Sequence, residues 1–148
     1  MSNLDDLYRE IILDHYRTPR NRGELAPPAV KAEGFNPLCG DEITVYLDVT
    51  NGVITDIKLT GHGCSISQAS SSLMSAAVKG KPLEDVRRTI ESVKAMLTEG
   101  AEVATDTASL RSLGELAALS GVSKFPVRIK CATLAWNTLV QALDELPA

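Results

Sequence analysis

The 148-residue sequence has no long hydrophobic run, no excess of positive charge and no even set of cysteines. Its longest stretch without Asp, Glu, Lys or Arg, residues 59–78, is rich in Ser, Thr, His and Gln, which argues against a membrane span. A net charge of −4 leaves no basic footprint for a phosphate backbone, so nucleic acid is not an expected partner. Three cysteines do not suit a disulfide framework, so thiol chemistry or metal binding is the more favoured role for them.

The N-terminal segment is acidic and lacks a positively charged region followed by an apolar run. We therefore expect no secretory signal and a cytoplasmic protein. Apolar residues make up 44% of the chain and charged residues 23%, which is enough apolar material for a core. The length predicts a single domain, residues 1–148, and no internal repeat or low-complexity tract divides it.

Hydrophobic periodicity predicts a helix at the start of the chain and then a small antiparallel sheet. Apolar residues recur at helical spacing over residues 4–15. A short edge strand is expected at residues 30–35. Strict alternation before and after Asn51 and Gly52 predicts a two-stranded hairpin with a type I′ turn. With helices after the sheet, the fold class is α+β, with about three strands.

A run of helical signals follows the predicted hairpin. Ser65, with Gln68 three residues later, matches a capping box, and the helix it opens is expected to end at Gly80. The small residues on this helix would let it lie close to the sheet. The remaining helices are predicted to begin at Pro82, near Leu110 with a break at Gly121, and at Pro126.

Each cysteine lies beside a predicted structural boundary. Cys39 comes just before the hairpin, Cys64 between the hairpin and the next helix, and Cys131 near the start of the last helix. No CxxC pair is present, so spacing alone is a weak zinc signal, although these three boundaries can meet at one end of a small domain. Scattered cysteines are more often buried packing residues. The glycines beside Cys39 and Cys64, however, indicate turns, where a small core residue has little reason to sit.

Asp41 can complete a set of four metal ligands. It follows Cys39 by two residues, so in an extended segment both side chains point to the same side. Three thiolates and one carboxylate around Zn²⁺ would leave an excess of negative charge, which Arg128 and Lys130 beside Cys131 can offset. The alternatives are an Asp that caps a turn at the strand entrance, and basic side chains that are simply solvated.

The two histidines are weaker candidates. His15 lies on the apolar stripe of the first helix, so we expect a hydrogen-bonded, half-buried structural histidine rather than a ligand. His62 precedes Cys64 by two residues and stands between glycines, from where it can reach a metal near Cys64. A turn histidine with a free tip explains its position as well.

Four motifs occur in order: DHYRTPRNRG at residues 14–23, NPLCGD at 36–41, GHGCSISQASSS at 61–72 and FPVRIKCA at 125–132. Together they resemble the U-type iron–sulfur cluster assembly family over nearly the whole chain, which implies an IscU/SufU-like fold. IscU-type members carry a His immediately before the last Cys, where this chain has Lys130, a poor ligand when protonated. The interval between Cys64 and Cys131 is also longer, with the surplus around residues 98–123. In both features the chain is similar to the SufU branch.

The resemblance implies a zinc site made by Cys39, Asp41, Cys64 and Cys131, and a zinc-dependent sulfurtransferase activity. It also implies that Cys39 accepts persulfide sulfur from a SufS-type cysteine desulfurase and passes it to a downstream acceptor or a SufBCD-type scaffold. From its position we expect Arg128 to pair with Asp41, or with Cys39 when that residue is released. Two alternatives stay open: a non-enzymatic scaffold for a 2Fe–2S cluster on the same ligands, and a structural zinc domain that binds a partner.

Overall fold

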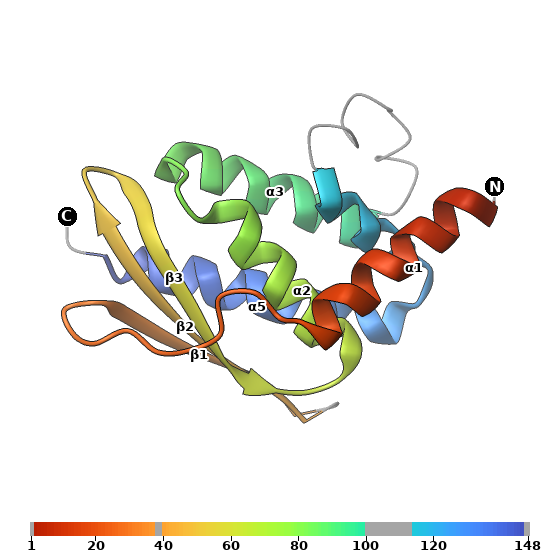
Figure 1. Cartoon of the computed structure of the whole chain (residues 1–148), viewed down its shortest axis with the longest axis horizontal. Helices are drawn as coiled ribbons and strands as arrows, with labels where there is room; N and C mark the ends of the chain where they lie inside the picture. The colour runs from red at the N-terminus through yellow and green to blue at the C-terminus, as the bar shows by residue number, and fades with distance from the viewer. Residues whose placement is uncertain (1, 38–39, 100–113, 147–148) are drawn as a thin grey trace.

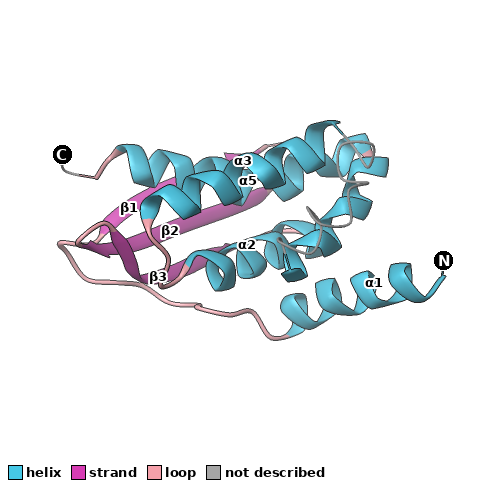
Figure 2. Cartoon of the chain, turned by 90° about the horizontal axis from the view of Figure 1, so that it is seen from above, coloured by secondary structure: helices cyan, strands magenta, loops and turns pink. Residues whose placement is uncertain are grey.

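A computed structural model describes residues 2–37, 40–99 and 114–146 of the chain (Figure 1). Three antiparallel strands form one sheet in the order β1-β2-β3. Helices α2 and α5 pack on one face of this sheet, which gives the layered arrangement seen in Figure 2. The elements are α1 (Ser2–Arg17), β1 (Val30–Asn36), β2 (Asp41–Thr50), β3 (Val53–His62), α2 (Ser65–Val78), α3 (Leu83–Glu99), η2 (Gly114–Lys124) and α5 (Pro126–Asp144).

The hairpin and the edge strand predicted from alternation are both confirmed. Asn51 and Gly52 have φ angles of 54° and 75°, as a type I′ turn requires, and β2 pairs with β3 on either side of them. On β2 the residues Ile43, Val45 and Leu47 are buried at alternate positions, where they face the helices. The fold class predicted from the sequence is therefore correct.

The free edge of β3 is covered at two places by other segments of the chain. Leu59 exchanges two backbone hydrogen bonds of 2.9 Å with residues 21–23. Ile54 exchanges two more, of 2.7 and 3.0 Å, with residues 80–81. Because unpaired strand edges invite pairing with other chains, these two short segments protect one side of the sheet.

The boundaries of two helices differ from those predicted. The capping box at Ser65 is wrong: Ser65 is the first helical residue, and the N-cap is Cys64, which makes no side-chain cap bond. Helix α2 ends at Val78 with Lys79 as its C-cap, and Gly80 follows with a φ of 81°, so the prediction that Gly80 terminates this helix is confirmed. Pro82 was expected inside the following helix, but α3 begins at Leu83 and Pro82 only accepts its first hydrogen bond, from the Val86 N–H.

The predicted break at Gly121 is also wrong. A 3₁₀ helix, η2, runs through it from Gly114 to Lys124. Leu116, Leu119 and Val122 of η2 are buried in the core, and their burial outweighs the conformational entropy that a helical glycine costs. The expected helix start near Leu110, like residues 100–113 of the predicted insertion at 98–123, lies outside the described residues. The last helix begins at Pro126 as predicted.

Helix α2 is packed on several sides, and its small residues make this possible. Five of its serines are buried: Ser67, Ser70, Ser71, Ser72 and Ser75. The Ser70 hydroxyl donates to the Ala132 carbonyl of α5 at 2.7 Å and accepts the indole N–H of the fully buried Trp136 at 3.0 Å. This fixes α2 against α5. None of the helices in the described part of the chain is long and apolar enough to cross a membrane.

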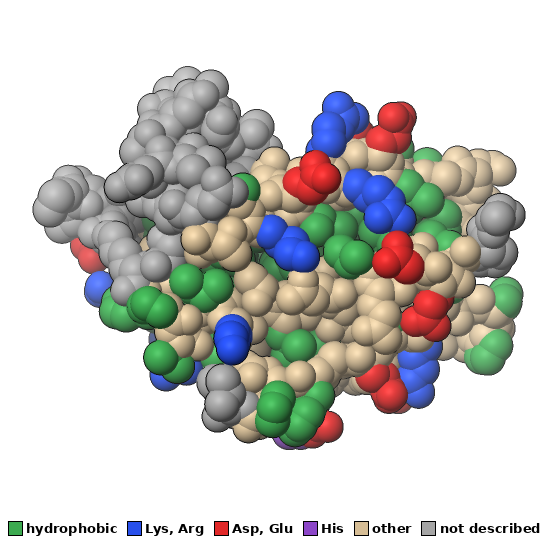
Figure 3. Space-filling view, turned by 180° about the vertical axis from the view of Figure 1, so that it is seen from behind, with side chains coloured by type: hydrophobic (Ala, Val, Ile, Leu, Met, Phe, Trp, Pro, Cys, Tyr) green, Lys and Arg blue, Asp and Glu red, His purple; other side chains and the backbone are tan. Residues whose placement is uncertain are grey.

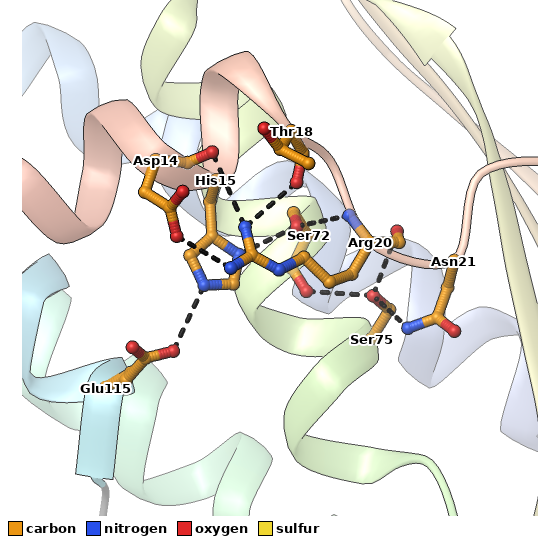
Figure 4. Close-up of polar contacts among 8 residues, drawn as sticks. All are labelled: Asp14, His15, Thr18, Arg20, Asn21, Ser72, Ser75 and Glu115. Carbon is orange, nitrogen blue, oxygen red and sulfur yellow. Dashed lines mark hydrogen bonds and ion pairs between the residues drawn. The ribbon is translucent and has the colours of Figure 1, made fainter.

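The DHYRTPRNRG motif fastens α1 to α2. The His15 ring is 1% exposed and lies between Ser72 Oγ, 2.7 Å from Nδ1, and Glu115 Oε1, 3.1 Å from Nε2 (Figure 4). The same Ser72 hydroxyl accepts the Arg20 backbone N–H at 2.8 Å. The expectation of a hydrogen-bonded structural histidine is therefore confirmed, but His15 is fully buried rather than half-buried, because α2 and η2 both cover its ring.

Candidate metal centre

Asp41, Cys64 and Cys131 meet where β2, α2 and α5 begin. Their ligand atoms all lie within 4.8 Å of one another. Asp41 is the first residue of β2, Cys64 is the N-cap of α2 and Cys131 lies in the second turn of α5. Asp41 and Cys131 are fully buried, and Cys64 is half-buried. Thus the structure brings three of the four predicted ligands together, while Cys39 lies outside the described residues.

The Asp41 carboxylate caps the N-terminus of α2, where the N-cap residue Cys64 makes no side-chain cap bond. Its Oδ1 accepts the Cys64 backbone N–H at 2.9 Å. Its Oδ2 stands 3.9 Å from Cys64 Sγ. A carboxylate at a helix N-terminus is favoured by the helix dipole, which here helps to hold a buried charge in place. One oxygen is therefore engaged by the backbone, and the other faces the sulfur atoms.

Arg128 is the cation of this cluster. The charge of the Cys64 thiolate, a hydrogen bond to it and the charge of Cys131 raise the pKa of Arg128 above its ordinary value. The guanidinium is exposed at the surface of the site. Arg128 stands one turn before Cys131 on α5, which places it beside these two sulfurs. Its expected pairing with Asp41 or with a released Cys39 stays a prediction, and Cys39 lies outside the described residues.

The donor set fits a zinc ion. Both Cys64 and Cys131 are free thiols, and two sulfurs with one carboxylate oxygen are ligand types that Zn²⁺ takes in tetrahedral sites. Ligands on one zinc ion stand roughly 3.3–3.8 Å apart, so atoms already within 4.8 Å need only small movements to meet on it. A fully buried carboxylate beside two thiols also suits a cation, because an unpaired buried charge is costly.

Neither His62 nor Lys130 adds a ligand. His62 is exposed, and its Nε2 lies 2.7 Å from Glu42 Oε2, the residue opposite it on β2. Among the residues that the structure describes, the candidate metal group contains no histidine. Lys130 is exposed next to the buried Cys131. His62 is therefore not part of this group, and the alternative of a turn histidine with a free tip is also wrong, because His62 ends β3 and its ring is paired with Glu42.

A groove of about 430 Å³ opens beside the cluster, between α1, η2 and the start of α5. Arg128, which interacts with both sulfur atoms, lines it together with Phe125, and Ile12, Ile66 and Val122 give it an apolar wall. In the face shown in Figure 3, hydrophobic side chains are spread over the lower left, the bottom, the centre and the right edge, while most acidic side chains lie in the right half.

The sequence model of the NifU-like N-terminal domain matches residues 7–132. The chain belongs to this family. Among NifU-like relatives it is 44% identical to the zinc-dependent sulfurtransferase SufU of Bacillus subtilis, over 97% of this chain and 94% of the relative. It is 40% identical to the iron–sulfur cluster assembly scaffold protein IscU of Thermotoga maritima, over 95% and 94% of the two chains. The predicted resemblance to the SufU branch of the family is confirmed.

Solved structures of NifU-like proteins have the same fold. A crystal structure of an assembly scaffold protein for the SUF system, FiSufU from Fervidobacterium islandicum, is 31% identical, covers 90% of this chain and 94% of its own, and superposes with a TM-score of 0.80. The NifU-like protein of Brucella abortus is 26% identical over 95% of this chain and 94% of its own, with a TM-score of 0.79. These likenesses confirm the IscU/SufU-like architecture.

Proposed function

We propose that this NifU-like protein is a zinc-dependent sulfurtransferase of iron–sulfur cluster biogenesis, in which Cys39 accepts persulfide sulfur from a SufS-type cysteine desulfurase. The observation that carries the proposal is the convergence of Asp41, Cys64 and Cys131, with Arg128 beside the two sulfurs. The name of the Bacillus subtilis relative supports the same activity. Because free thiols persist in a reducing compartment, we place the protein in the cytoplasm.

Cys39, Asp41, Cys64 and Cys131 would hold the zinc ion, whose charge, when bound, keeps its thiol ligands deprotonated. Cys39 stands two residues before Asp41, so the chain itself keeps their Cα atoms within about 7 Å. Between them Gly40 has a φ of 69° and nothing within 4 Å of the place where a Cβ would stand. Gly40 thus gives the reactive residue room to turn.

The sulfur transfer needs no external oxidant or reductant. The Cys39 thiolate attacks the outer sulfur of the desulfurase persulfide, the sulfur–sulfur bond of the donor breaks, and the donor cysteine leaves as a thiolate. The new persulfide on Cys39 passes to a downstream acceptor or SufBCD-type scaffold by the same exchange. Arg128 lies where it can stabilise the anionic sulfur in each step. No proton has to cross the site.

The mouth of the site suits a protein partner. Phe125 and Val127, three residues and one residue before Arg128, are 61% and 73% exposed. Apolar side chains at these exposures become buried when a partner covers them, which is a common source of binding free energy. We therefore place the desulfurase contact at this end of the molecule.

The test is a single turnover of a purified SufS-type desulfurase with cysteine, followed by mass spectrometry of this protein. We expect the wild-type chain to gain one sulfur on Cys39 and Cys39→Ser to gain none. A matched control adds Thr55→Cys to the Cys39→Ser chain, which places an exposed thiol near the hairpin tip. Sulfur on Cys64, Cys131 or the control cysteine at the wild-type level would overturn the assignment.

The second candidate is a scaffold for a 2Fe–2S cluster on the same ligands, which the 40% identity to the Thermotoga maritima IscU favours. Metal analysis of protein purified without oxygen separates the two functions. About one zinc per chain and no iron–sulfur chromophore is the result we expect. Stoichiometric iron with acid-labile sulfide would instead establish the scaffold.

A further inference from the structure

Gly63 lies directly against the Asp41 carboxylate. A Cβ placed on Gly63 would overlap Asp41 Oδ1 and stand 2.9 Å from Asp41 Cγ and 2.6 Å from Ser67 Oγ. Separations under 3.0 Å are essentially never seen for real Cβ atoms, so one of the groups would have to move. Any side chain at position 63 therefore competes with the carboxylate for the same space.

The carboxylate has little freedom to yield. Asp41 is fully buried, and its backbone pairs with Asn36 of β1, while the next residue, Glu42, pairs with His62 of β3. The strand is thus held on both sides, so the clash is relieved chiefly by rotation of the carboxyl group. Such a rotation breaks the 2.9 Å hydrogen bond from the Cys64 N–H and turns Oδ2 away from Cys64 Sγ.

We propose that Gly63 is a positioning residue of the metal centre: its lack of a side chain seats the Asp41 carboxylate with Oδ1 on the Cys64 N–H and leaves Oδ2 alone to bind the metal. This inference rests on one part of the proposed function, namely that Asp41 and Cys64 are metal ligands. It assigns one-oxygen coordination to Asp41, because Oδ1 is held by the Cys64 N–H and Oδ2 is the oxygen that faces the Cys64 sulfur.

The neighbouring glycines have different roles. A Cβ on Gly61 would overlap the Glu42 carbonyl, so Gly61 permits strand pairing rather than carboxylate placement. Gly121 in η2 has open space around the corresponding position and no positive φ. Gly121→Ala is the control for adding one methyl group in open space. Gly63 also has a φ of 159°, at which any side chain is strained, so the contact with the carboxylate is isolated by comparing Gly63→Ala with and without Asp41.

The first experiment measures Zn²⁺ affinity by competition with a chromophoric chelator. Relative to wild type, we expect Gly63→Ala to lower the affinity at least tenfold and Gly121→Ala to change it by less than twofold. Co²⁺ added in place of Zn²⁺ gives an absorption spectrum that reports the ligands directly, and we expect this spectrum to shift in Gly63→Ala. An unchanged affinity and spectrum in Gly63→Ala would overturn the inference.

A double-mutant cycle shows whether Gly63 acts through Asp41. In the Asp41→Ala background the carboxylate is gone, so Gly63→Ala is expected to lower Zn²⁺ affinity less than threefold. An equal loss in both backgrounds would contradict the proposal, because Gly63 would then act on the sulfurs or the loop. Wild-type protein that bound no Zn²⁺ at all would defeat the proposed function instead, which keeps the two failures distinguishable.

Stability supplies a readout even if Gly63→Ala folds poorly. Removing the carboxylate removes the main clash, so the metal-free double variant with Asp41→Ala is expected to melt at a higher temperature than metal-free Gly63→Ala. Thermal unfolding followed by circular dichroism measures this difference. A double variant that melts at the same or a lower temperature would show that the clash with Asp41 is not what Gly63 avoids.

Discussion

Helix α2 carries two buried polar clusters that differ in charge balance. Around Ser72, both ring nitrogens of His15 have partners within the chain, Ser72 itself and Glu115. At the start of the same helix, Asp41 and two thiols converge on a site whose cation, Arg128, is exposed at its surface. A cluster satisfied by the protein's own groups contributes stability, whereas one with surplus acidic ligands is built to receive a cation. The comparison predicts that the two clusters can be disrupted separately.

The largest expected effect is metal removal. Stripping the bound ion with a chelator should lower the melting temperature by roughly 10 °C, because zinc at a thousandfold excess over its dissociation constant stabilises by about 4 kcal/mol. Calorimetry with and without chelator measures the change. Cys131→Ser, which removes a ligand, should show little further loss on chelation, and a large chelator effect in that variant would place the metal elsewhere.

The pH dependence of zinc binding gives a second test of the same cluster. Thiols must lose protons when they bind the ion, so apparent zinc affinity should fall as the pH drops from 8 to 6. The competition assay repeated across this range measures it. A flat affinity would count against thiolate ligation, and addition of Glu115→Gln, at the other cluster, should leave the slope unchanged.

The next largest effect concerns the cluster of His15, Ser72 and Glu115, whose hydrogen bonds are all made within the chain. His15→Ala should lower the free energy of unfolding by about 2–3 kcal/mol, since it removes two hydrogen bonds and leaves the Ser72 hydroxyl one partner short. Urea unfolding measures the loss, and the number of zinc ions per chain should stay the same. Tyr16→Ala, at the exposed neighbouring position, is the control and should change stability by less than about 0.5 kcal/mol. Loss of zinc in His15→Ala would show that the clusters are coupled.

Arg128→Ala should separate chemistry from metal retention. We expect sulfur transfer from the desulfurase to fall roughly tenfold, the equivalent of one charge-assisted hydrogen bond, while zinc content is retained. Lys130→Ala is the matched control and should have a smaller effect, because a lysine is a less directional donor. Titration of each variant against the desulfurase, with alanine production and zinc content measured together, decides the point. Unchanged turnover and partner affinity in Arg128→Ala would show that Arg128 has no role in the site.

The smallest effect is expected at the protein surface next to the His15 cluster, in which both ring nitrogens have partners. A hydrogen bond from Arg20, 2.6 Å from Asp14 Oδ2, lowers the pKa of Asp14 below its ordinary value of 3.8. This stabilisation is therefore present above pH 3.8 and is lost as the pH falls through the folded-state pKa. Asp14→Asn should lower the urea midpoint slightly at pH 7 and leave it unchanged near pH 2. An equal loss at both pH values would mean that the charge of Asp14 is not what matters.

The elements that sequence patterns predicted best are those set by local chemistry. Asn51 and Gly52 dictate their own turn, and Pro126 marks its own helix start, so neither depends on distant residues. The capping box at Ser65 failed because the group that caps α2, the Asp41 carboxylate, arrives from another element. The pattern around Ser65 and Gln68 contains no trace of that partner.

For the candidate site, too, the sequence predicted the features set by local position and missed those that depend on distant contacts. The three cysteines and Asp41 stand out because each lies at a boundary between elements, and the structure brings the three described ligands together. The contact between Gly63 and Asp41 was missed, because it depends on how closely two strands and a helix approach. In the sequence Gly63 indicates only a turn, and its φ of 159° favours glycine in any case, so nothing there points to Asp41. The pairing of His15 with Glu115, across 100 residues, was equally invisible.

The short connection between β1 and β2 sets the order of events in any sulfur relay. Residues 37–40 join Asn36 to Asp41, which face each other in the sheet, so Cys39 sits on a tether only a few residues long. A persulfide on such a tether has a reach of roughly 10 Å from the sheet, much less than the width of a protein partner. The desulfurase that donates the sulfur and the protein that accepts it must therefore bind the same end of the molecule, one after the other. Under the proposed function their binding is mutually exclusive, and an excess of either one inhibits the relay.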